Sequence, residues 1–207
     1  MLGGTLKPTA RTTAVYAAAL CCALIAQTAV AQTAVAQTAV QLDPATTEIH
    51  YKVGTLLHTV HGTFRMTKGN LQFDPHTGAA TGEIDIDATS GNSDNGSRDK
   101  KMTKEVLEGQ KYPTIAFLPK QVIGSVSPSG PSNIQVKGIF RIHGQDHELT
   151  LPVTITPSGS AYTASTKFNI PYVAWGMKNP STFVLTVEKT VEITIDTKAK
   201  LAAAAAK

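Results

Sequence analysis

The sequence has 207 residues, of which 42% are hydrophobic and 16% are charged. This fits one globular domain with residues left over for a leader. Its 19 Lys and Arg against 15 Asp and Glu give a formal net charge of +4. Because this excess is small and no block of basic residues occurs, the composition excludes a typical nucleic-acid-binding protein.

The N-terminus has the pattern of a secretory signal peptide. Lys7 and Arg11 make it positively charged, the run 14–26 is apolar or small, and residues 29–31 form a small-x-small cleavage pattern. The apolar run is shorter than the roughly 20 residues that a membrane-spanning helix needs. We therefore predict that residues 1–31 are a signal peptide and that the mature protein is periplasmic or secreted.

The segments that flank the main domain have simple compositions. The five-residue unit QTAVA repeats after the apolar run, and residues 32–43 are predicted to be a flexible spacer with a second cleavage point at Ala36. Residues 199–207 are predicted to be an alanine-rich tail. Cys21 and Cys22 lie in the apolar run, so the mature protein is expected to have neither thiols nor a disulfide.

Residues 44–198 show the alternation of antiparallel strands with one apolar face and one wet face. Apolar residues take alternate positions in three clear runs: Ile134, Val136, Gly138, Phe140 and Ile142; Leu149, Leu151, Val153 and Ile155; and Val191, Ile193 and Ile195. Turn signals rich in Gly, Pro, Asn and Asp separate the runs. The spacing predicts about eight strands.

One segment departs from this period. Met102, Val106 and Leu107 are spaced as on a helix, with Ser97 as a plausible N-cap and Gly109 as a plausible end. We therefore predict an all-β protein with one short helix. A sheet with one apolar face either packs on a second sheet or closes into a barrel, and an eight-stranded barrel either is filled by side chains or holds one small ligand.

Several motifs in fixed order resemble the YceI-like family of exported lipid-binding proteins, and they cover essentially the whole mature domain. They are HTVHGTF at 58–64, KYPTIAF at 111–117, IFRIHG at 139–144, HELTLPV at 147–153, and WGM at 175–177 followed by NPS at 179–181. The resemblance implies a closed, lipocalin-like antiparallel barrel over residues 44–198. It also implies a carrier, without a catalytic step or a cofactor, for a long apolar ligand such as a polyisoprenoid, an isoprenoid quinone or a fatty amide.

In such a carrier, large apolar side chains are expected to contact the ligand. The predicted ligand-binding residues are Phe64, Phe73, Ile86, Phe117, Phe140, Phe168, Trp175 and Met177. Trp175 has two interpretations: a plug in the core or at the barrel end, or an indole over the cavity mouth. The charged segment from Arg98 to Lys104 is either a solvated helix face or a lip that meets the ligand head or a membrane surface.

The histidines do not form a predicted metal site. His58 and His61 are three residues apart, which places them on opposite faces of a strand, and His143 and His147 lack a third ligand. Two other functions stay open: an adhesion or interaction domain built as a filled β-sandwich, and an enzyme acting on a bound lipid with His58, His61 or His143 as its acid or base.

Overall fold

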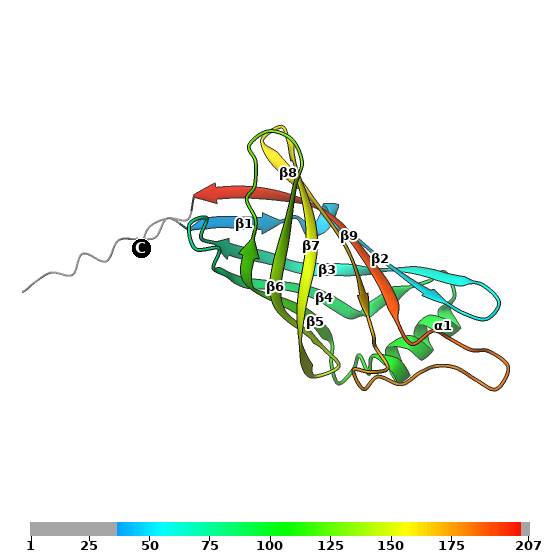
Figure 1. Cartoon of the computed structure of the whole chain (residues 1–207). Helices are drawn as coiled ribbons and strands as arrows, with labels where there is room; N and C mark the ends of the chain where they lie inside the picture. Colours follow the sequence, from blue (N-terminus) through cyan, green and yellow to red (C-terminus); the bar gives the residue numbers. More distant parts are fainter. Residues whose placement is uncertain (1–36, 204–207) are drawn as a thin grey trace, which may run out of the picture. The chain divides into compact units, whose positions relative to one another are not determined.

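The computed structural model describes residues 37–203, and most of these residues lie in antiparallel β-strands (Figure 1). The predicted signal peptide, its cleavage positions, Cys21 and Cys22 lie outside the described residues. The described residues contain nine strands: β1 (Thr38–Leu42), β2 (Glu48–Gly54), β3 (Thr59–Phe73), β4 (Ala80–Asn92), β5 (Thr114–Ile123), β6 (Ser132–Ile142), β7 (Gln145–Ser158), β8 (Ala161–Ile170) and β9 (Val191–Ala203).

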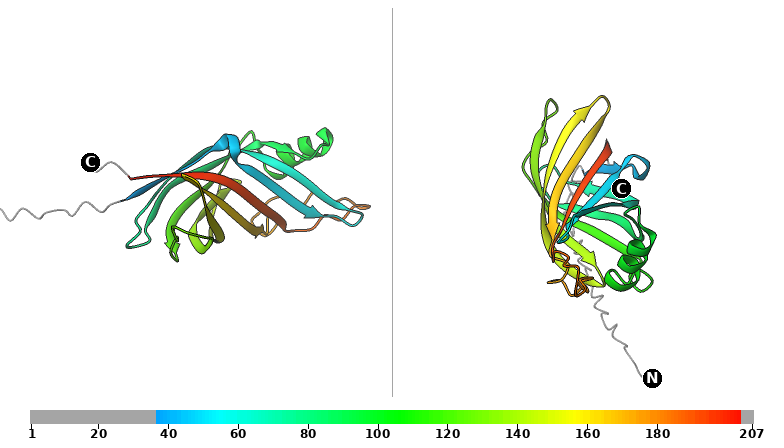
Figure 2. Two further views of the ribbon diagram at one scale, coloured as in Figure 1. Left: turned by 90° about the horizontal axis from the view of Figure 1, so that it is seen from above. Right: turned by 90° about the vertical axis from the view of Figure 1, so that its right-hand side faces the viewer.

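The strands form a closed ring with eight positions. Around the ring, each strand from β2 to β9 pairs with its neighbours, and the pairing of β3 with β4 closes the circle. Strands β1 and β2 share one position, because both pair with β3 on one side and β9 on the other. The short 3-10 turn η1 (Pro44–Thr46) separates them. The structure therefore confirms the predicted barrel, whose strands Figure 2 shows around a common axis.

The strands extend beyond the predicted domain boundaries. Strand β1 lies within the predicted spacer of residues 32–43, and β9 continues into the predicted tail of residues 199–207. These two extensions pair with each other, from Thr38 opposite Ala203 to Leu42 opposite Ala199. Leu42 and Ala199 are buried in the apolar cluster, so burial of apolar surface stabilises a strand that the low-complexity repeat does not reveal.

The predicted helix connects β4 to β5 in two parts. Helix α1 (Gly96–Lys101) continues as one π-helical turn, η2 (Met102–Val106). The N-cap is Asn95 and not Ser97, because the extended Asn95 accepts a hydrogen bond from the Arg98 amide through its side chain at 3.0 Å. Ser97 already lies inside the helix.

Alternate residues of each strand point into the barrel, as the sequence pattern predicts. On β6, for example, Ile134, Gly138, Phe140 and Ile142 are buried, whereas Gln135, Lys137 and Arg141 are exposed. The tight connection from β6 to β7 uses two residues with positive φ, His143 (53°) and Gly144 (73°). This is the geometry that two-residue hairpins favour.

Candidate ligand cavity

A cavity of about 500 Å³ lies inside the barrel at the end where α1 packs. Its wall comes from seven of the strands, from α1 and η2, and from the connector between β8 and β9, which spans residues 171–190. Most lining side chains are aliphatic or aromatic. Three of them, Val191, Ile193 and Ile195, point inward from β9 yet stay only half-buried, because they face the cavity.

Five of the eight predicted ligand-binding residues line this cavity. Phe64, Ile86, Phe140 and Phe168 do so from four different strands, and Met177 does so from the connector. Met177 is 3% exposed and Phe140 is 5% exposed, so both are closely packed parts of the wall. Their contact with a ligand stays a prediction.

The other three predicted residues lie outside the lining. Phe117 is a packing residue: Gly138 on the next strand leaves room for its ring, and a Cβ built at Gly138 would lie 2.7 Å from Phe117 Cζ. Phe73 ends β3 opposite Ala80 and Thr38, far along the barrel. Trp175 packs on the core from the connector. An inward position on a strand therefore does not by itself distinguish a lining residue from one that fills the core.

A few polar side chains are part of the cavity wall. Arg98 and Lys101 of α1 line the cavity, and so does the hydroxyl-bearing Tyr51 of β2. The Arg98 guanidinium donates to the side chain and backbone oxygens of Ser93 at 2.7 and 2.6 Å, and the Ser93 hydroxyl donates to Asp99 at 2.5 Å. This network anchors the start of the helix to Ser93, the residue that follows β4, and holds the Arg98 side chain in place.

The Tyr51 hydroxyl has no hydrogen-bond partner among the described residues, although the side chain is only 5% exposed. Burial raises the pKa of Tyr51 above its ordinary value of 10.0, so the phenol stays protonated at neutral pH. It is therefore a buried hydrogen-bond donor on the cavity wall, and a buried donor without a partner costs free energy.

The connector covers one side of the cavity and is held by contacts within itself and to its neighbours. The Tyr172 hydroxyl donates to the Glu188 carbonyl at 2.7 Å and so joins the two ends of the connector, and the Glu188 amide donates to the Gly54 carbonyl of β2 at 2.9 Å. Burial raises the pKa of Tyr172 to about 12. Lys178 forms an ion pair with Glu105 of η2 at 2.6 Å. Apart from Trp175 and Met177, the sequence analysis assigned no residue of this connector to the ligand site, because the segment has neither the strand nor the helix period. Its apolar residues Leu185 and Val187 were the available signal.

The histidines are separated in space. His58 lines the cavity from the β2–β3 loop, whereas His61 is exposed on the outer face of β3. The His143 ring packs against Tyr112 with ring centroids 4.9 Å apart, and its Nε2 lies 3.2 Å from a Glu108 carboxylate oxygen. Within residues 37–203, no three His, Cys, Asp or Glu side chains are grouped as a metal site would require.

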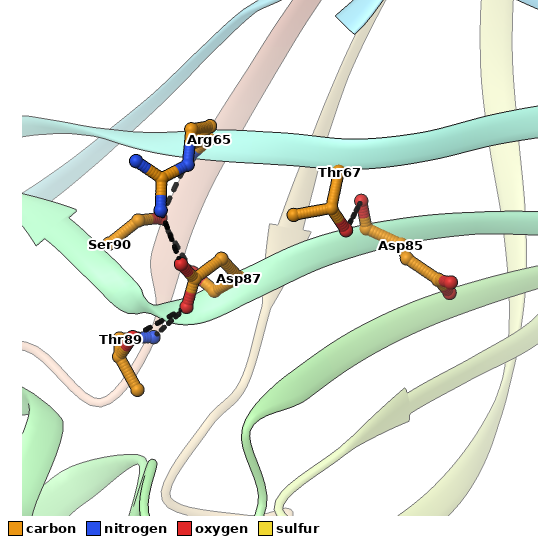
Figure 3. A network of polar contacts seen from close by, with 6 residues as sticks. All are labelled: Arg65, Thr67, Asp85, Asp87, Thr89 and Ser90. Carbon is orange, nitrogen blue, oxygen red and sulfur yellow. Dashed lines mark hydrogen bonds and ion pairs between the residues drawn. The ribbon is translucent and has the colours of Figure 1, made fainter.

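The acidic residues of β4 are absent from the cavity lining and lie on the outer face of the barrel. Figure 3 shows the polar contacts around two of them, Asp85 and Asp87. Asp87 forms an ion pair with Arg65 at 2.6 Å and accepts hydrogen bonds from the amide and hydroxyl of Thr89 at 2.8 and 2.6 Å. These hydrogen bonds lower the pKa of Asp87, and the bond from the Thr89 hydroxyl has the largest effect. Burial instead raises the pKa of Asp85. Neither carboxyl reaches the cavity lining.

Comparison with known proteins decides the family. The family profile described as YceI-like domain matches residues 40–199, which is most of the chain and all of the barrel except the outer ends of β1 and β9. The chain belongs to the YceI-like family. No functionally curated protein matches the sequence.

Solved structures share the fold of this YceI-like domain at low sequence identity. BcnA of Burkholderia cenocepacia has 19% identity and a TM-score of 0.60, covering 76% of this chain and 98% of its own. A polyisoprenoid-binding domain from Saccharophagus degradans has 13% identity and a TM-score of 0.61, covering 79% and 98%. The YceI protein of Campylobacter jejuni has 17% identity and a TM-score of 0.54, covering 67% and 83%. Within the described part of this chain, no helix has both the length and the hydropathy of a membrane span.

Proposed function

We propose that this YceI-like protein is an exported carrier that holds one long apolar chain inside the barrel, with the polar head of the ligand at the cavity mouth. The cavity of about 500 Å³ with its apolar wall carries this proposal. Its size falls within the range of about 300 to 1,000 Å³ that small-molecule sites occupy. A filled β-sandwich would have no such space, and export is supported by the signal-peptide pattern of residues 1–31.

The wall indicates the chemistry of the ligand body. Each CH₂ group moved from water into such a wall contributes about 0.8 kcal/mol, so a chain of several isoprene units or a fatty chain would bind without a strong polar anchor. The solved domain from Saccharophagus degradans is described as polyisoprenoid-binding. We extend that ligand class to this chain because the wall of its cavity is mostly apolar.

The mouth indicates the chemistry of the head. The residues that line the cavity include the cations Arg98 and Lys101 and the Tyr51 hydroxyl, but no Asp or Glu. Such a rim offers hydrogen-bond donors and positive charge. It therefore suits a head that accepts hydrogen bonds, such as a phosphate, a quinone or an amide carbonyl. It does not suit an ammonium head.

Cavity occupancy is tested with a neutral apolar dye, N-phenyl-1-naphthylamine, whose fluorescence rises in an apolar site, and with its displacement by a long-chain isoprenoid quinone. Ile193→Trp would fill the cavity from β9, and we expect dye affinity to fall at least about tenfold. Thr194→Trp is the matched control, because the adjacent residue of a strand points to the opposite face. Equal dye binding by both variants, or none by the wild type, would reject the proposal.

A further inference from the structure

Two loop tips beside the cavity mouth carry large apolar side chains in the solvent. Leu56 and Leu57, between β2 and β3, are 71% and 76% exposed. Phe183 and Val184, in the connector, are 106% and 78% exposed. Together these four residues are called the apolar tips below. They are the four most exposed large hydrophobic side chains among the described residues.

Each pair sits at the end of a tight turn. The Thr55 amide donates to the His58 carbonyl at 2.9 Å, and the Thr182 amide donates to the Leu185 carbonyl at 2.8 Å. Tips of such turns are normally built from Gly, Asn, Asp, Pro or Ser. Two consecutive large apolar residues at both tips therefore expose apolar surface with no benefit to the turn itself, which is the usual sign of a binding surface.

The two tips are fastened side by side. The Leu56 amide donates to the Thr186 carbonyl at 3.0 Å, and Thr55 forms an isolated bridge with Val187. In Figure 1 the β2–β3 loop and the connector reach the same end of the barrel, and Figure 2 shows them together from above. The apolar tips thus form one surface on a hydrogen-bonded base and not two independent loops.

This surface is continuous with the cavity. The residues that flank the tips, Thr55 and His58 on one loop and Thr182 and Leu185 on the other, line the cavity themselves. No Asp, Glu, Lys or Arg occurs in 55–58 or in 181–187. The nearest cations on the cavity wall are Arg98 and Lys101, and the Lys101 ammonium donates to the Pro180 carbonyl at 3.2 Å beside the connector tip.

From this arrangement we infer that the apolar tips insert into a phospholipid bilayer and hold the cavity mouth against it. The inference rests on the proposed function, because a ligand too apolar to dissolve in water must be collected from, or released to, a lipid phase. Exposed apolar residues that enter the acyl boundary, with cations near the headgroups, are the features that bind a protein to an anionic membrane surface. The apolar chain then passes between bilayer and barrel along a continuous apolar path.

Vesicle co-sedimentation tests this inference with the purified protein. Leu57→Ser combined with Phe183→Ser should weaken binding to vesicles of phosphatidylcholine and phosphatidylglycerol by at least about tenfold, because two large apolar side chains no longer enter the bilayer. The control pair is Ile123→Ser with Leu201→Ser, since these two residues are also exposed, at 39% and 42%, near the other end of the barrel. Residues 1–36 are the same in every variant, so any contribution from them cancels.

Unchanged vesicle binding by the tip variant, or an equal loss in the control pair, would overturn the inference. A third result would also overturn it: the wild-type protein does not bind vesicles, but sedimentation velocity shows a dimer that the tip variant does not form. The apolar tips would then contact a second copy of the protein and not a membrane. Dye uptake from dispersed solution separates the two proposals. The tip variant should still take up the dye. If the wild-type protein takes up no dye, the carrier function is rejected, whatever the result of the vesicle experiment.

Discussion

The imidazole of His147 stacks face to face on the indole of Trp175, with ring centroids 4.0 Å apart and ring planes within 7° of parallel. Trp175 also packs against Phe140, with ring centroids 6.0 Å apart, and Phe140 lines the cavity. Burial lowers the pKa of His147 below its ordinary value of 6.5. The stack therefore consists of a neutral imidazole and an indole that together hold the connector against β7.

Acid should weaken this stack. Because the pKa of His147 is lower in the folded protein than in the unfolded chain, its contribution to stability is complete above about pH 7 and is lost as the pH falls below about 6. His147→Gln should therefore reduce the fall in urea-unfolding free energy between about pH 7 and about pH 5. The fluorescence of Trp175, the only tryptophan, reports the same protonation in the folded state. An identical pH profile in wild type and variant would contradict this.

The two buried tyrosines of the cavity wall should respond differently to loss of their hydroxyl groups. Tyr172→Phe removes the donor to the Glu188 carbonyl and should lower the unfolding free energy by about 1 kcal/mol. Tyr51→Phe removes a hydroxyl without a partner, so stability should stay the same or rise. Tyr51→Phe should nevertheless weaken the binding of a quinone more than that of the dye, because a quinone carbonyl accepts a hydrogen bond well and the diarylamine nitrogen of the dye accepts one poorly. Denaturant melts and dye displacement of both variants check this pair.

The acidic residues on the outside of β4 should have opposite effects on stability. The pKa of Asp87 is lowered, mainly by the hydrogen bond from the Thr89 hydroxyl. The Asp87 carboxylate therefore stabilises the fold above about pH 4, and this stabilisation is lost as the pH falls further. Asp87→Asn should destabilise the protein by about 1 kcal/mol at neutral pH and by less in acid. Burial raises the pKa of Asp85, so Asp85→Asn should cause no loss at neutral pH. Equal losses in the two variants would contradict the contacts in Figure 3.

The barrel was predictable from the sequence because its strands obey a strict period. Alternate positions from Ile134 to Ile142 on β6 point inward as predicted, and the ordered motifs identify the family that the profile match confirms. Strand β1 was not predictable in this way. Its residues 38–40 belong to a repeated low-complexity unit, and only pairing with the distant end of β9 shows that residues 38–42 form a strand.

The cavity was predictable only in part, because lining residues and filler residues share the same pattern. Phe117 and Phe140 both point inward from neighbouring strands, yet only Phe140 meets the cavity. The two residues differ in their neighbours, which the sequence pattern does not show: the Phe117 ring packs in the space that Gly138 leaves on the next strand. The connector that completes the wall has no period, and the apolar tip at Phe183 and Val184 becomes meaningful only once its position beside the mouth is known.

Native mass spectrometry shows whether the barrel holds a long apolar molecule. The protein is purified without detergent from its own host, its intact mass is measured under native and denaturing conditions, and the bound material is extracted into organic solvent and identified. We predict a native mass that exceeds the denatured mass by one lipid with a long apolar chain and an oxygen-bearing head, and less of this lipid in Ile193→Trp. Equal native and denatured masses, with no uptake of added polyprenyl quinone, would show that the barrel is not a carrier of such molecules.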